Sequence, residues 1–197
     1  MKKLLFSLLV SFSFLVPAHA DETCMSPYMA KIVGQEDYVY VWTLGVEGLG
    51  DEQDKLVTID VSPKSKTYGK VVSVLSVGGR NEAHHSGLSD DRHYLWAGGL
   101  DTNKIFIFDV HSNPRKPKLH KVITDFVEKS GGMVGPHTFY ALPGRMMVSA
   151  LSNNSDHGGR TGLAEYNDAG EFVASHWLPT DGDLRGCLLY TSDAADD

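Results

Sequence analysis

The sequence predicts an all-β fold made of repeated units, on two observations. Short runs of β-branched and aromatic residues alternate with clusters of Gly, Pro, Asn, Asp and Ser, as strands alternate with turns. Parts of this pattern then recur about every 50 residues along the chain. The one helical pattern, around residues 123–129, is too short to change the fold class.

The expected strands are short and spread over most of the chain. Each run has the length of a strand and is bounded by turn residues. The runs are residues 38–44, 56–61, 70–77, 94–97, 105–110, 146–151, 163–166 and 172–177.

Two internal matches define the repeat. Residues 55–61 (KLVTIDV) match residues 104–110 (KIFIFDV) at an offset of 49, and residues 163–168 form a third copy. His85 and His137 align at an offset of 52, just upstream of the first strand expected in each unit. A unit of this length with several short strands is typical of a β-propeller blade. We expect about three such blades, and the repeat argues against the alternative of a small β-sandwich.

The two ends of the chain predict how the protein is processed. Residues 1–20 combine Lys2 and Lys3, an apolar run and an Ala-His-Ala ending, which is typical of a secretory signal peptide. Residues 187–197 (CLLYTSDAADD) resemble the translation of a sequencing adapter. We expect a periplasmic or secreted protein with no membrane anchor after signal cleavage. Residues 21–186 are then the N-terminal part of a longer propeller domain.

The charge balance excludes one class of partner. The chain has a formal net charge of −7, from 18 Lys and Arg against 25 Asp and Glu. Its basic residues are scattered, whereas a protein that binds nucleic acid gathers them into a patch. We therefore expect no nucleic-acid partner.

Histidines carry the candidate chemistry. His85 and His137 occupy matching positions in successive repeats, and the inner strands of a propeller converge on a central channel. Neutral imidazoles delivered to one channel suit copper, zinc or iron. His84 precedes His85 and joins it on one side only where the backbone is irregular, which Ser86 and Gly87 permit. The alternative is that these are hydrogen-bonded histidines near blade turns.

Two further residues are candidates for supporting roles. Glu82 is close enough in sequence to orient an imidazole through a hydrogen bond. Cys24 is the one cysteine between residues 21 and 186, so no disulfide can form within that stretch. Its thiol is a reactive group, a soft metal ligand or a small buried residue.

Four segments resemble the selenium-binding protein family, of the SBP56 type. They are residues 82–87 (EAHHSG), 117–123 (PKLHKVI), 135–138 (GPHT) and 21–29 (DETCMSPYM), and the last is similar to the bacterial periplasmic branch. The resemblance implies a seven-bladed propeller with copper in its channel. It also implies that His84, His85 and His137 are copper ligands, and that at least one more ligand lies outside this chain.

The resemblance further implies a reaction and its partners. Methanethiol, a small thiol, would react with O2 and water to give formaldehyde, hydrogen sulfide and hydrogen peroxide. Vertebrate-type members have a selenium-associated cysteine after the residue that matches Tyr68, and this chain has Gly69 there. Selenium binding is therefore not expected at that position, which leaves Cys24 as the candidate thiol.

Two other functions compete with a copper-dependent thiol oxidase. One is a non-enzymatic carrier of selenium or copper on the same scaffold, with Cys24 as the acceptor. The other is a hydrolase of the lactonase kind, which builds its site from carboxylates and Asn around a hard cation. The predicted channel positions are rich in His and poor in carboxylates, which disfavours the hydrolase.

Overall fold

The structure is a computed structural model that describes residues 26–154 and 158–179. This part of the chain contains three antiparallel sheets and one short helix, α1 (Phe126–Lys129), which confirms the all-β class. The expected signal peptide, Cys24 and the segment 187–197 lie outside the described residues. Within the described ranges, no helix has the length and apolarity that crossing a membrane requires.

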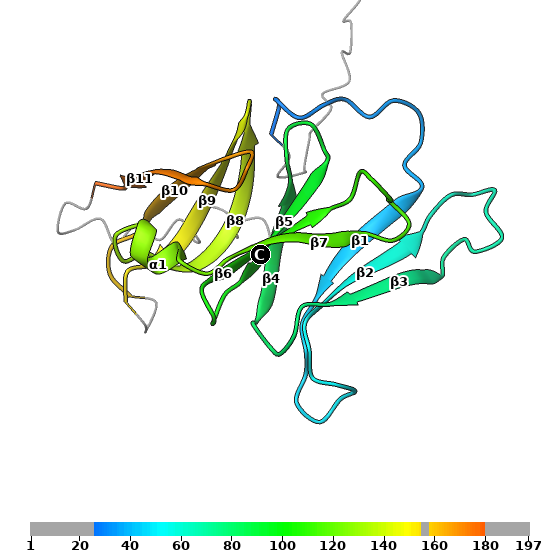
Figure 1. Ribbon diagram of the computed structural model, residues 1–197, viewed down its shortest axis with the longest axis horizontal. Coiled ribbons are helices and arrows are strands. Elements are labelled where there is room, and N and C mark those ends of the chain that lie inside the picture. The colour runs from blue at the N-terminus through cyan, green and yellow to red at the C-terminus, as the bar shows by residue number, and fades with distance from the viewer. Residues whose placement is uncertain (1–25, 155–157, 180–197) are drawn as a thin grey trace, which may run out of the picture.

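Each sheet is a meander in which consecutive strands pair (Figure 1). The first sheet contains β1 (Tyr38–Thr43), β2 (Lys55–Asp60) and β3 (Val71–Ser76). The second contains β4 (Ala83–Leu88), β5 (Tyr94–Gly99), β6 (Lys104–Asp109) and β7 (Lys118–Ile123). The third contains β8 (Val134–Leu142), β9 (Arg145–Ser152), β10 (Gly162–Asn167) and β11 (Phe172–Trp177). Figure 1 shows the sheets following one another across the molecule, as the blades of a propeller do.

The internal repeat preserves both a strand and the turn that follows it. The matching segments form β2, β6 and β10, and each pairs with the next strand, β3, β7 or β11, at one edge of its sheet. Asp60 ends β2, and its Oδ1 accepts a hydrogen bond from the Ser62 N–H at 3.0 Å. Asp109 ends β6, and its Oδ1 accepts one from the His111 N–H at 3.0 Å. The short polar side chain thus initiates the same kind of turn in both blades.

Two apolar clusters hold the sheets together. The cluster between the second and third sheets includes Trp96 and Tyr166, whose ring centroids lie 5.9 Å apart. The cluster between the first and second sheets includes Trp42 and Phe108, with centroids 5.7 Å apart. Trp42 also donates from Nε1 to the carbonyl of Gly98 at 2.9 Å. Burial of each such side chain stabilises the fold by about 1.5–3 kcal/mol, so the sheets pack as one body.

Three strands are present that the sequence pattern does not predict, although all eight predicted runs form strands. β4 (AHHSGL) and β7 (KLHKVI) lack a clean alternation of apolar and polar residues, and β8 opens with Val-Gly-Pro-His. The histidines were expected just upstream of the first strand of each unit. That expectation is wrong, because His84 and His85 lie inside β4 and His137 lies inside β8.

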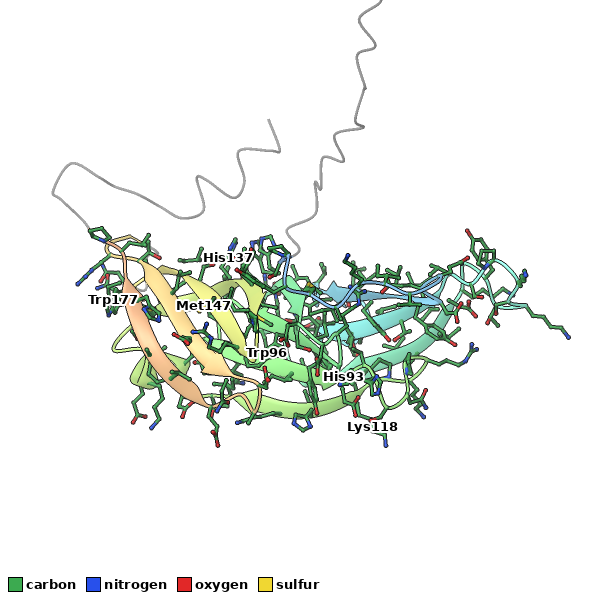
Figure 2. The ribbon with its side chains drawn as sticks, turned by 90° about the horizontal axis from the view of Figure 1, so that it is seen from above. His93, Trp96, Lys118, His137, Met147 and Trp177 are labelled. Carbon is green, nitrogen blue, oxygen red and sulfur yellow. The ribbon has the colours of Figure 1, made fainter. Side chains whose placement is uncertain are left out.

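The strands that contain the histidines form one edge of their sheets. β4 and β8 each begin a four-stranded sheet, and they contact one another directly through Gly87 and Phe139. Figure 2 shows the sheets in an arc, with His137 on one edge and Lys118 of β7 on the opposite edge. The inner strands of neighbouring blades therefore bring the histidines to a common edge.

Candidate metal centre

A β-bulge in β4 contains two adjacent histidines. Ala83 pairs with Gly99 and Ser86 pairs with Ala97, so His84 and His85 together oppose one residue of β5. In a regular strand these neighbours would point to opposite faces. The bulge re-aims them, which is the backbone irregularity that joint ligation requires.

β8 contains the equivalent bulge in the next blade. Pro136 pairs with Ala150 and Phe139 pairs with Val148, so His137 and Thr138 together oppose Ser149 of β9. The first residue of each bulge is a histidine, His84 in β4 and His137 in β8. The sequence offset of 52 instead aligns His85 with His137. The pairing of the strands shows that His84 is the structural equivalent of His137, one residue earlier.

The three histidines form a compact cluster. Their candidate ligand nitrogens all lie within 4.8 Å of one another. The ring centroids are 4.6 Å apart for His84 and His85, 4.7 Å for His84 and His137, and 4.2 Å for His85 and His137. His137 is buried, with 2% of its surface exposed, whereas His85 is half-buried and His84 is exposed. The cluster thus extends from the interior to the surface.

Two glycines allow the second and third sheets to approach closely enough for this. A Cβ atom on Gly87 would lie 2.8 Å from the Cβ and the carbonyl oxygen of Phe139 in β8. A Cβ atom on Gly98 would lie 2.5 Å from the carbonyl oxygen of Pro136. Real Cβ atoms essentially never approach another atom this closely. The absence of side chains at both positions therefore allows His137 to lie against the histidines of β4.

The donor set suits a first-row transition metal. Imidazole nitrogens bind such ions at about 2.0–2.1 Å, so two ligands of one ion lie at most about 4 Å apart. Side-chain rotations that move the nitrogens by about an ångström would bring all three from within 4.8 Å to that spacing. Imidazole suits copper, zinc, iron and nickel, and divalent copper has the highest affinity of this series. His84, His85 and His137 therefore fit copper.

A cavity of about 400 Å³ adjoins the cluster. His85 and Thr138 contribute to its wall, and its apolar lining includes Met29, Leu88 and Phe139. A small apolar molecule in this cavity would lie against an imidazole of the cluster.

Comparison with known proteins identifies the family. The model of the 56kDa selenium binding protein (SBP56) matches residues 18–185. The chain belongs to the selenium-binding protein family. It is 66% identical over 179 residues to a methanethiol oxidase of Ruegeria pomeroyi, covering 91% of this chain and 41% of that protein. It is 61% identical over 178 residues to a methanethiol oxidase of Hyphomicrobium, covering 89% of this chain and 40% of that protein. The chain thus spans about two fifths of the length of these relatives.

A solved structure of the family supports the propeller architecture. The selenium-binding protein of Sulfolobus tokodaii superimposes with a TM-score of 0.66 at 29% sequence identity. The match covers 79% of this chain and 39% of that structure. The three sheets described here are therefore blades of the family's β-propeller.

The other predicted site residues have different surroundings. Glu82 immediately precedes β4 with a positive φ of 61°, and its Oε2 lies 3.6 Å from Nη2 of Arg80. That contact is an ion pair, and the expected orientation of an imidazole by Glu82 stays a prediction. Cys24 lies outside the described residues, so its proposed role as a thiol acceptor also stays a prediction.

Sequence reasoning missed the residues that fix the bulge of β8. The Thr138 N–H donates to Ser149 Oγ at 3.0 Å, and the two hydroxyl oxygens are 2.6 Å apart. These bonds connect the bulged residue next to His137 to the opposing strand. The available signal was Thr138, a hydroxyl residue next to His137. Its partner, Ser149, is eleven residues away in sequence and becomes apparent only from the strand register.

Proposed function

We propose that the protein is a methanethiol oxidase that uses copper held by His84, His85 and His137. One methanethiol, one O2 and one water would give one formaldehyde, one hydrogen sulfide and one hydrogen peroxide, in which carbon is oxidised and O2 is reduced. The observation that carries the proposal is the three-histidine cluster at the wall of an apolar cavity. The names of the relatives that are 66% and 61% identical support the same activity.

The chain's own residues would contribute ligation, position and exclusion of water. Copper, when bound, would acidify a coordinated thiol and exchange electrons with O2. His137 would anchor the ion from the buried side, while His84 and His85 would complete the ligation from the bulge of β4. Met29, Leu88 and Phe139 would pack against the methyl group and displace water from the thiol.

The apolar lining also favours a small thiol over a polar substrate. A sugar or peptide would leave its hydroxyl and amide groups facing Met29, Leu88 and Phe139, which costs free energy for each polar group left without a partner. Methanethiol has one polar group, the thiol itself, which would lie at the histidines. We further propose a periplasmic location, which rests on the expected leader in residues 1–20.

The proposal is tested by peroxide release from methanethiol. We expect turnover by the copper-loaded protein, and a loss of at least about 100-fold in His85→Ala and in His137→Ala, because changes outside the ligand set already cost about 10–100-fold. His120→Ala is the control, since that exposed imidazole packs against Tyr94 on the outer part of the blade. A protein that loads selenium through Cys24 and turns over no methanethiol at any copper level would instead be a carrier.

A further inference from the structure

The cavity beside His85 has a second polar wall that methanethiol would not use. His85 contributes to one part of its lining, and Arg92 and Glu36 contribute to another. Arg92 belongs to the turn between β4 and β5, where its N–H donates to the Ser89 carbonyl at 2.9 Å. His85 and Ser89 are four positions apart along an extended strand, a span of about 13 Å. The cavity therefore has both an imidazole of the histidine cluster and the side chain of Arg92 in its lining.

The guanidinium group of Arg92 is only partly paired within the described residues. Its side chain is 16% exposed, and its Nη2 pairs with Oε1 of Glu36. Nη1 is fully buried and has no hydrogen-bond partner among the described residues. A buried donor left without a partner is costly, and a hydrogen bond from a guanidinium group to a carboxylate is about twice as strong as one between neutral groups.

The backbone at Arg92 is also held in an uncommon conformation. Its φ is 63°, in the left-handed region that favours Gly, Asn and Asp. An arginine at this turn position therefore carries backbone strain that a glycine would avoid. Strain of this kind is concentrated at ligand-binding and catalytic positions.

We propose that this cavity binds a short aliphatic chain ending in a carboxylate, which would pair with the guanidinium group of Arg92 in the cavity lining. Leu88, Leu95 and Phe139 line the cavity and would pack against the methylene groups. The other end of the molecule would lie at His85. That this end is a thiol rests on the proposed function. The substrates would then include mercaptocarboxylates as well as methanethiol. The carboxylate subsite stands on Arg92 alone and does not depend on oxidase activity.

The test is calorimetric titration of the full chain with hexanoate and with hexanamide, its neutral analogue. We expect hexanoate to bind at least about tenfold more tightly, because a hydrogen bond to a charged group is worth about that factor. Arg92→Gln should remove this preference. Equal binding of the two molecules to the wild-type protein, or no binding of hexanoate, would overturn the proposal.

A second variant separates ligand recognition from a structural ion pair. Glu36→Gln breaks the same ion pair but leaves the guanidinium in place, so hexanoate should bind as tightly as before or more tightly. If Glu36→Gln and Arg92→Gln weaken hexanoate binding equally, the pair is structural and the subsite does not exist. Arg145→Gln is the matched control, since it breaks a guanidinium–carboxylate pair with Glu165 at 2.9 Å outside the cavity. Because the readout is binding, methanethiol turnover can fail without affecting this result.

Discussion

Asp60 shows how one residue connects the end of β2 to the turn that follows it and to the next blade. Its side chain is almost completely buried, and its Oδ2 accepts hydrogen bonds from Ser65 Oγ at 2.6 Å and from Thr67 Oγ1. Nη1 of Arg115, from the next blade, lies 3.4 Å from the same oxygen. The bonds from Ser65 and Thr67 hold the pKa of Asp60 below its ordinary value of 3.8.

This depressed pKa predicts a defined loss of stability in acid. A carboxyl group whose pKa is lower in the folded state stabilises that state above its unfolded pKa, and the contribution is lost as the pH falls. The free energy of unfolding should therefore decrease from about pH 5 downwards, and Asp60→Asn should make this decrease shallower. Urea denaturation at a series of pH values measures both slopes.

The control for Asp60 is an acidic residue that is exposed. Asp101→Asn is measured at the same pH values, because it also removes one carboxylate but from an exposed position. An Asp60→Asn variant whose free energy of unfolding follows the wild-type pH profile would show that the hydrogen-bonded carboxylate contributes nothing to acid sensitivity.

Among elements, the contact between β4 and β8 has the greatest consequence for the site. Gly87→Ala would place a methyl group 2.8 Å from Phe139, so the two sheets must separate. Overpacking of this kind costs about 1–3 kcal/mol, and here it also moves His137 away from His84 and His85. We expect a lower free energy of unfolding together with weaker copper binding. Thermal unfolding and copper titration measure the two effects.

Ser86→Ala provides the comparison within the same strand. Ser86 is exposed and pairs across β4 and β5 with Ala97, so removal of its hydroxyl should change stability by less than about 0.5 kcal/mol. If Gly87→Ala bound copper as tightly as Ser86→Ala does, the close approach of the sheets would not be what assembles the cluster.

The strands that follow a hydrophobic pattern were predictable, and those that carry the histidines were not. β2, β6 and β10 follow the repeat because each packs side chains into the core. β4 and β8 are inner strands whose bulges, glycines and histidines replace apolar alternation. Functional strands break the local pattern because their residues are selected for position at the site rather than for burial.

The candidate site was predictable as a set of residues but not as an arrangement. The adjacent pair of His84 and His85 and the repeat position of His137 singled out all three histidines. Their convergence depends on the close contacts of Gly87 and Gly98 across two sheets, which no local pattern encodes. The cavity and Arg92 were not predicted either, because Arg92 and His85 come to line one cavity only through the packing of β4, β8 and the segment before β1.

At the scale of the whole molecule, the first sheet presents an apolar face away from the second sheet. Val41 pairs with Val57, which pairs with Val74, so these side chains share one face of the sheet. Val39 and Val71 flank Ile59 on the same face. Exposed fractions of 37% for Val41 and 56% for Val74 leave this face accessible to another molecule.

This face predicts self-association of the chain at high concentration. The double variant Val41→Thr and Val74→Thr should raise the dissociation constant at least about tenfold, since burial of a valine contributes about 1.5 kcal/mol or more. Sedimentation velocity across a concentration series measures it. A Val173→Thr variant alters an exposed valine on β11, outside the first sheet, and should have a smaller effect. A wild-type chain that stays monomeric throughout would contradict the prediction.

The central claim is that three histidines from two blades form one copper centre. Electron paramagnetic resonance of the copper-loaded protein tests it most directly, because nitrogen hyperfine splitting counts the coordinated imidazoles. We predict three coupled nitrogens from this chain in the wild-type protein and one fewer in each of His84→Ala, His85→Ala and His137→Ala. Copper that binds without nitrogen coupling, or a spectrum that is unchanged when all three are replaced by alanine, would contradict the account.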